Sequence, residues 1–203
     1  MTRFLKRGLD LILAGLGLAV SSPLWALIAA AIKIDSPGPV FYSQARVGER
    51  GRVFMVMKFR SMIADAERAS GPLQAQAHDP RVTRVGRVLR ATAMDELPQL
   101  WNIFRGDMSF VGPRALRPEE IELAGDRSVP LEQIPGFVER CRVPPGLTGI
   151  AQIYAPRDIT RRQKFRFDRL YIERQSFLLD VRLILLSFWI SMRGTWETRA
   201  KKF

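Results

Sequence analysis

The chain has very few of the residues that most often build metal centres and nucleophilic triads. Among its 203 residues there is one cysteine, Cys141, and one histidine, His78. A disulfide within the chain, a cysteine zinc cluster and a two-histidine metal site are therefore excluded. A Ser-His-Asp or Cys-His triad could use only His78, and a lone histidine is more often structural or exposed than catalytic.

Two phosphate-handling motifs are also missing from the sequence. There is no G-x-x-x-x-G-K-[ST] segment, which argues against P-loop chemistry. No two aspartates are separated by a single residue, so the Asp-x-Asp metal site of many nucleotide-sugar enzymes is missing as well.

Acidic residues are scarce relative to basic ones. The 20 Asp and Glu stand against 32 Lys and Arg, which gives a formal charge of +12, and 26 of the 32 are arginine. This balance predicts an anionic partner, such as nucleic acid, a phospholipid surface or a phosphorylated substrate. Arginine grips phosphate with a planar fork, although codon bias in a GC-rich genome explains the arginine excess equally well. The length is typical of one domain with a sizeable core.

Charge is entirely absent from Leu11 to Ile32. As a straight helix these residues would span about 33 Å, enough for a hydrocarbon core of about 30 Å. Arg3, Lys6 and Arg7 precede the stretch and Lys33 follows it. Basic residues at both ends suit a segment that enters and leaves the membrane on the same, cytoplasmic side.

Three interpretations of this stretch compete: a signal peptide cleaved near Ala29–Ala31, a single transmembrane helix, and a re-entrant helical hairpin. Ser22 and Pro23 lie near its middle, where proline is expected to kink the helix and serine can satisfy the freed backbone groups. The break favours a re-entrant hairpin over residues 1–34, followed by a catalytic domain over residues 35–203.

The pattern after the apolar stretch predicts a β-hairpin. Val40–Val47 and Val53–Phe59 are β-prone runs on either side of a glycine-containing turn. Ser61 is expected to cap a short helix that runs from Met62 to Ala69.

Two later segments predict amphipathic helices. Arginine recurs every third residue from Arg81 to Arg90 with valine and leucine between, which indicates either a solvated face or a stripe that faces phosphate or lipid. Phe177–Met192 is apolar, but its charge-free part is too short to span a membrane and fits a core or interfacial helix. Together these elements predict an α+β fold, mostly helical, with interfacial helices around the active site.

The most informative segment contains the adjacent carboxylates Asp95 and Glu96. Pro98 follows them, and proline is tolerated in the first turn of a helix, while Gly106 can end that helix. Acidic residues are common in a first turn for structural reasons alone. Here, however, arginines flank the pair on both sides, so the two carboxylates can hold Mg²⁺ and face a diphosphate. An aspartate can also attack phosphorus as a nucleophile.

The sequence resembles the bacterial sugar transferase family, the monotopic phosphoglycosyl transferases, over nearly its whole length. Four blocks in order carry the resemblance: residues 37–62, with Pro37-Gly38-Pro39 and Lys58-Phe59-Arg60; residues 79–90, beginning Asp79-Pro80-Arg81; residues 94–114, with Asp95-Glu96-Leu97-Pro98-Gln99-Leu100; and residues 145–152, with Pro145-Gly146-Leu147-Thr148-Gly149.

The resemblance implies a reaction and a place in the cell. Family members move a sugar-1-phosphate from a UDP-sugar to a polyprenyl (undecaprenyl) phosphate and release UMP. Asp95 would be the nucleophile that forms a phosphosugar-aspartyl intermediate, and Glu96 would help to hold Mg²⁺. Ser22 and Pro23 match the break in the family's re-entrant helix. The expected location is the bacterial inner membrane, with the catalytic domain on the cytoplasmic face.

Further site residues are predicted from charge and from the resemblance. The candidates for phosphate contact are Lys58, Arg60, Arg90 and Arg114, and the candidates for the donor site are Gln152, Arg157 and Asp168. The sequence departs from the family at Ser61, at Ala115 and after Gln152, which puts the last loop in doubt.

The expected partners are the donor, the acceptor and membrane lipid. A nucleic-acid-binding protein would leave the apolar stretch unexplained, and an inactive scaffold would leave the Asp95-Glu96 pair unexplained. The choice of UDP-sugar, the pathway and the oligomeric state stay open, and a homodimer is one alternative.

Overall fold

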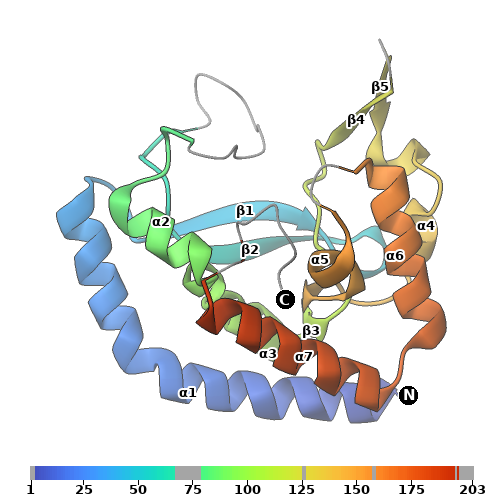
Figure 1. Cartoon of the computed structure of the whole chain (residues 1–203), viewed down its shortest axis with the longest axis horizontal. Coiled ribbons are helices and arrows are strands. Elements are labelled where there is room, and N and C mark those ends of the chain that lie inside the picture. Colours follow the sequence, from blue (N-terminus) through green and yellow to red (C-terminus); the bar gives the residue numbers. More distant parts are fainter. Residues whose placement is uncertain (1–2, 67–78, 125–126, 157–158, 195, 197–203) are drawn as a thin grey trace.

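In the computed structural model, which describes residues 3–66, 79–124, 127–156, 159–194 and 196, the apolar stretch forms the helix α1 (Arg3–Asp35). This helix runs along the base of the molecule and then turns upward (Figure 1). Pro23 lies inside it and has no N–H to donate to the carbonyl of Ala19, which explains the bend. The Ser22 hydroxyl donates to that same carbonyl at 2.9 Å, so the freed acceptor is satisfied within the helix.

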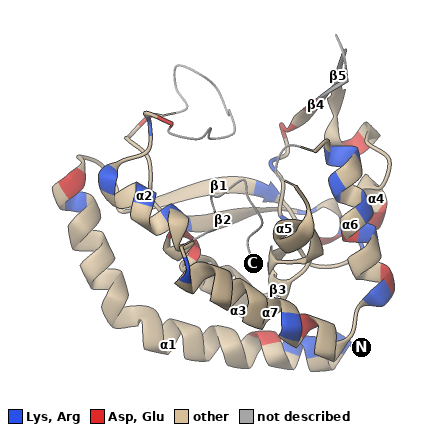
Figure 2. Cartoon of the chain, viewed as in Figure 1, with Lys and Arg blue, Asp and Glu red and all other residues tan. Residues whose placement is uncertain are grey.

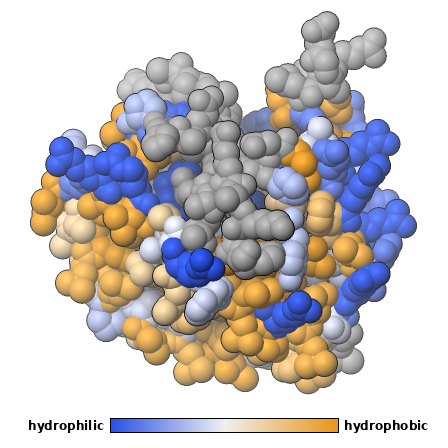
Figure 3. Space-filling model, viewed as in Figure 1, coloured by the Kyte–Doolittle hydropathy of each residue, from blue (hydrophilic) through white to orange (hydrophobic). Residues whose placement is uncertain are grey.

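α1 is apolar and long enough to cross a membrane, and only 11% of its most apolar window is buried. Its charged residues lie toward its two ends (Figure 2), and orange, apolar surface dominates the lower face of the molecule (Figure 3). A helix that packed in a soluble core would bury these side chains instead. The exposure therefore favours a lipid environment for α1.

The predicted hairpin is confirmed. Strands β1 (Phe41–Val47) and β2 (Val53–Phe59) pair antiparallel around a 3₁₀ turn, η1 (Glu49–Gly51). Phe59 is opposite Phe41, and the hairpin runs across the middle of the molecule in the view of Figure 1. This places Lys58 near the end of β2.

The expected helix from Met62 to Ala69 is wrong over the residues described. Met62 forms an isolated bridge with Val82 instead. The amide of Ile63 donates to the carbonyl of Arg81 at 2.9 Å, and the amide of Thr83 donates to the carbonyl of Ser61 at 3.2 Å. Because these backbone groups pair with a distant segment, they are not available for helical hydrogen bonds.

The arginine stripe and the acidic pair lie on consecutive helical elements: α2 (Arg84–Ala91), the 3₁₀ turn η2 (Met94–Glu96) and α3 (Gln99–Arg105). Gly106 ends α3 with a φ of 98°, as predicted, but the α-helix begins at Gln99 with Pro98 as its N-cap, later than the expected start around Asp95 to Leu97. The stripe is shorter than expected, because Arg81 precedes α2 and forms an ion pair with Asp79 at 2.7 Å.

The remaining strands form two small sheets in the described part of the chain, and five helical elements accompany them. β3 (Ser109–Val111) pairs parallel with β6 (Gly146–Thr148), and β4 (Ile121–Ala124) pairs antiparallel with β5 (Arg127–Pro130). The helical elements are η3 (Leu131–Gln133), α4 (Phe137–Arg140), α5 (Ile150–Tyr154), α6 (Arg161–Arg174) and α7 (Phe177–Met192). The bounds of α7 agree with the predicted helix, and the mostly helical α+β class is confirmed.

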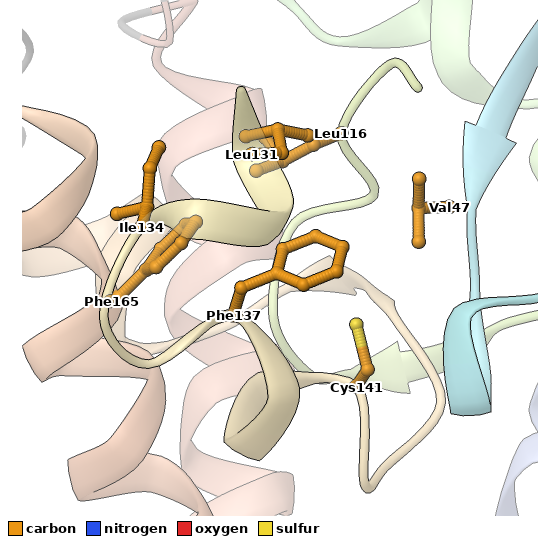
Figure 4. Close-up of a cluster of buried hydrophobic side chains, with 7 residues drawn as sticks. All are labelled: Val47, Leu116, Leu131, Ile134, Phe137, Cys141 and Phe165. Carbon is orange, nitrogen blue, oxygen red and sulfur yellow. The ribbon is translucent and has the colours of Figure 1, made fainter. Parts of the chain in front are cut away.

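Several small clusters share the core. One of them joins β1, η3, α4 and α6 through Val47, Leu116, Leu131, Ile134, Phe137, Cys141 and Phe165 (Figure 4). The single cysteine is therefore a packed core residue.

The basic start of α1 is anchored to the rest of the chain by a buried ion pair. Lys6 Nζ lies 2.7 Å from Asp180 Oδ2 of α7 and donates to the carbonyl of Val111 at 2.9 Å. The sequence analysis used Lys6 only as a basic flank, because its partner is 174 positions away.

Candidate active site

A cavity of about 1510 Å³ extends from the bend of α1 to the acidic pair. Its lining is apolar where α1 and α7 contribute Val20, Leu24, Ile184 and Phe188. Around the acidic pair it is strongly basic. Among the described residues that line it, nine carry Lys or Arg side chains and five carry Asp or Glu. One end of the cavity therefore suits a hydrocarbon chain and the other suits phosphate.

The acidic pair lies in η2, in the turn that connects α2 to α3. Ala93, which precedes this turn, has a φ of 57°. A left-handed conformation is strained for a residue with a Cβ, and such strain gathers at functional sites. Asp95 is buried, with 8% of its surface exposed, although an aspartate is seldom buried without a reason.

Glu96 is held by two cations from different parts of the chain. Lys58 Nζ of β2 lies 2.5 Å from Glu96 Oε1, and Arg114 Nη2 lies 3.3 Å from the same oxygen. The Glu96 and Lys58 side chains are 16% and 19% exposed, so water screens this pair only partly.

The two neighbouring carboxylates have pKa values moved in opposite directions. Burial raises the pKa of Asp95 to about 6, against the opposing effect of Lys58 and with a further increase from Glu96. Burial by itself would also raise the pKa of Glu96. The attraction of Lys58 and Arg114 outweighs this effect and lowers the pKa of Glu96 to about 2. Such a split is typical of sites in which two carboxylates do different chemistry.

All four predicted phosphate-binding residues, Lys58, Arg60, Arg90 and Arg114, line the cavity. The guanidinium of Arg60, however, also has partners in the main chain. Its Nη1 donates to the carbonyl of Pro37, and its Nη2 donates to the carbonyl of Ser36 at 2.7 Å. The guanidinium thus satisfies carbonyls that follow the last turn of α1, and we propose this structural role for Arg60 in place of a phosphate contact.

The predicted donor-site residues Asp168 and Gln152 also line the cavity, while Arg157 lies outside the described residues, as does His78. Asp168 Oδ2 lies 2.9 Å from Arg140 Nε, and Arg140 Nη2 donates to the carbonyl of Arg114 at 2.6 Å. Through Arg140, Asp168 fixes the main chain that carries Arg114.

Gln152 has a comparable structural contact. Its Nε2 donates to the carbonyl of Gly112 at 3.1 Å and so supports the loop after β3. Direct donor contacts by Asp168 and Gln152 stay predictions.

Five cavity cations were missed as site residues: Arg46, Arg117, Arg140, Arg161 and Lys164. Arg46 belongs to the first family block, so its motif was visible while its position was not. Burial and the nearby Arg114 and Arg117 lower the pKa of Arg46 to about 10. An anion bound beside these like charges would relieve their repulsion.

The residues present fit a magnesium ion held jointly with substrate. No group of three His, Cys, Asp or Glu side chains gathers anywhere in the described part of the chain. Mg²⁺, however, is commonly bound by one or two carboxylates and completed by phosphate oxygens and water. Asp95 and Glu96 could provide such a minimal donor set, and magnesium binding by Glu96 stays a prediction.

The bacterial sugar transferase model matches residues 1–194. The chain belongs to this family. It is 44% identical over 187 residues to an undecaprenyl-phosphate glucose phosphotransferase of Komagataeibacter xylinus, a match that covers 90% of this chain and 35% of the relative.

Two further matches cover a larger share of the relative's length. A UDP-glucose:undecaprenyl-phosphate glucose-1-phosphate transferase of Caulobacter vibrioides is 43% identical, over 89% of this chain and 67% of the relative. The exopolysaccharide production protein PSS of Rhizobium leguminosarum is 38% identical, over 91% and 93%.

The chain thus spans between about a third and nearly all of the length of these relatives. The matched part contains α1, the Asp95-Glu96 pair and the described cavity lining except Trp196, so the acidic pair lies within the region that the family model covers.

Proposed function

We propose that the protein transfers a sugar-1-phosphate from a UDP-sugar to a polyprenyl phosphate at a membrane and releases UMP. The observation that carries the proposal is the pair of adjacent carboxylates with oppositely moved pKa values, set among Lys58, Arg90 and Arg114 in a cavity with an apolar arm. The printed names of the relatives, which include undecaprenyl phosphate and UDP-glucose, support this choice of substrates.

In the first half-reaction, a carboxylate oxygen of Asp95 attacks the sugar-linked phosphorus of the donor. A new bond forms between this oxygen and phosphorus, and the bond from phosphorus to the bridging oxygen breaks. UMP leaves with that electron pair, and the phosphosugar stays on Asp95 as an acyl phosphate. Arg90 and Arg114 lie where they can stabilise the negative charge that develops.

In the second half-reaction, a phosphate oxygen of the polyprenyl phosphate attacks the same phosphorus and displaces Asp95. The product is a polyprenyl diphosphate sugar, and the carboxylate is regenerated. Using one nucleophile twice lets a soluble donor and a lipid acceptor occupy the same basic site in turn. The apolar arm formed by α1 and α7 suits the start of the lipid chain.

Glu96 is the residue that we assign to hold Mg²⁺, with Asp95 beside it. The ion would supply positive charge at the diphosphate, where it lowers the energy of the transition state. Because Lys58 and Arg114 keep Glu96 ionised, this carboxylate stays available as a ligand throughout the physiological pH range.

We also propose that α1 is re-entrant, with residues 1–34 in one leaflet of the bacterial inner membrane and the catalytic domain on the cytoplasmic face. The bend at Pro23 and the basic residues at both ends of α1 support this topology. Cysteine labelling of vesicles tests it, since single cysteines near Arg3 and Lys33 should label from the same side. Labelling from opposite sides would establish a spanning helix.

The activity is tested by incubating the purified protein with a panel of UDP-sugars, polyprenyl phosphate and Mg²⁺. We expect repeated turnover with UMP release to require all three, with at most one UMP released per protein molecule when the acceptor is omitted, and we expect Asp95→Asn to abolish both. The donor labelled in its sugar should leave label on the wild-type protein when acceptor is omitted, but not on Asp95→Asn. Full turnover by Asp95→Asn would remove Asp95 as the nucleophile.

A further inference from the structure

Asn102 has a buried side chain that pairs with the open edge of β2. It lies in the middle of α3 and is 3% exposed. The amide of Met57 donates to Asn102 Oδ1 at 3.2 Å, and Asn102 Nδ2 donates to the carbonyl of Met55 at 2.8 Å. The side-chain amide thus takes the place that a neighbouring strand would occupy on β2.

A third hydrogen bond uses the second N–H of this side-chain amide. Asn102 Nδ2 also donates to Asp107 Oδ2 at 3.2 Å, which links the two ends of the turn that closes α3. Both amide hydrogens and the amide oxygen are therefore used. The amide accepts from one backbone group of β2 and donates to another. An apolar side chain or a carboxylate could not make this pair of bonds.

Asn102 joins β2, which carries Lys58, to α3, which follows the turn that carries Glu96. Lys58 directly follows Met57 on β2, and Glu96 lies in the turn that leads into α3. The separation of Lys58 Nζ and Glu96 Oε1 is 2.5 Å, so a small sliding of α3 along β2 would break it. α3 packs directly against β2.

We propose that Asn102 is a positioning residue for the acidic pair: by fixing α3 against β2, it sets where Asp95 and Glu96 meet the donor diphosphate. Asn102 does not line the cavity and so does not touch substrate itself. This inference rests on the proposed function for its catalytic readout. Misplacing a reacting group by about 1 Å can reduce a rate about 100-fold even when binding changes little.

The test compares Asn102→Asp with three other variants. Asn102→Asp keeps the oxygen that accepts from Met57 but loses both donated bonds, while Asn102→Ser shortens the side chain without adding a charge. Asp107→Asn alters the third contact and leaves both bonds to β2. Leu131→Ala serves as a control that is destabilised in a separate core cluster (Figure 4).

Each variant is assayed for UMP release below its Tm, with the rate expressed per folded protein. We expect Asn102→Asp and Asn102→Ser to lower kcat about 10- to 100-fold, with KM for the UDP-sugar within about threefold of wild type. Leu131→Ala and Asp107→Asn should keep kcat within about twofold. A kcat near the wild-type value in a folded Asn102 variant would overturn the proposal, and so would an equal loss in Leu131→Ala.

Hydrogen exchange gives a readout that does not depend on turnover. In Asn102→Ser the amides of residues 94–101 should exchange faster than in Leu131→Ala, because the acidic turn loses its attachment to β2. If the wild-type protein released no UMP while this difference appeared, the proposed function would fail and the positioning role would stand. Unchanged exchange over residues 94–101 would contradict the positioning role directly.

Discussion

Replacing Lys58 by methionine should leave Glu96 with an uncompensated negative charge in a mostly buried place. The pKa of this carboxyl lies at about 2 instead of its ordinary 4.5, which corresponds to about 3 kcal/mol in favour of the ionised form. Lys58 is closer to Glu96 than Arg114 is, at 2.5 Å against 3.3 Å, and it is also better buried. Because burial opposes this shift, the two cations together contribute more than the net, and we assign about 2 kcal/mol to the loss of Lys58.

The pH dependence of this contribution has a definite sign. Because the folded-state pKa of Glu96 is lowered, the ion pair adds stability above the unfolded pKa of 4.5, and this stability is lost as the pH falls from about 4.5 to about 2. The Lys58→Met variant should consequently differ most from wild type near neutral pH, and the two should converge in acid.

Thermal unfolding in detergent measures the effect. For a chain of this size, about 2 kcal/mol lowers the Tm by about 4 to 8 °C. The same substitution made in a Glu96→Gln background should lower the Tm much less, because the carboxylate that Lys58 neutralises is gone. Equal Tm losses in the two backgrounds would refute the assignment of this energy to the Lys58–Glu96 pair.

Three other predictions concern Gly86, Arg60 and the pH dependence of the reaction. Gly86→Ala should lower the Tm strongly or prevent folding, because the new Cβ would lie 1.9 Å from the backbone oxygen of Ser61; a Tm within 2 to 4 °C of wild type, about 1 kcal/mol, would show that α2 can shift. Arg60→Met should lower the Tm while KM for the UDP-sugar stays within about twofold, since its guanidinium binds main-chain carbonyls; a large rise in KM would restore Arg60 as a phosphate contact. The kcat/KM profile should fall below about pH 6, because burial raises the pKa of Asp95 to about 6 and the nucleophile must be ionised; a rate that stays level down to pH 4 would contradict this.

Local sequence patterns were sufficient for much of the fold. The β-prone runs around a glycine-containing turn predicted the hairpin, Gly106 predicted the end of α3, and the mostly apolar run from Phe177 to Met192 predicted α7. Each of these signals acts between residues that are close along the chain, so no knowledge of distant partners was needed. The expected helix after Ser61 failed because its backbone groups pair with residues 81–83, which a local pattern does not reveal.

The candidate site was also predicted in part from the sequence, and in part it depends on packing. The Asp95-Glu96 pair and its arginine-rich surroundings were visible in the sequence, as was the resemblance that gives them a reaction. The sequence could not separate Arg60, which completes the end of α1, from Lys58, which neutralises Glu96, although the two residues are two positions apart. Two positions along a strand would place both side chains on one face, but Arg60 follows the end of β2, and only packing decides which partner each side chain reaches.

By itself, the sequence determined the chemical type of this protein: an arginine-rich chain with one apolar anchor, almost no cysteine or histidine, and two adjacent carboxylates for the chemistry. The tertiary structure decided how those carboxylates differ. Burial acts on both, but Glu96 receives Lys58 from a strand 38 positions earlier and Arg114 from a loop 18 positions later, while Asp95 stays largely without that compensation. Electrostatic energy depends on distance and solvent exposure, and both are set by long-range packing, which is why the opposite pKa values of neighbouring residues became apparent only in the folded chain.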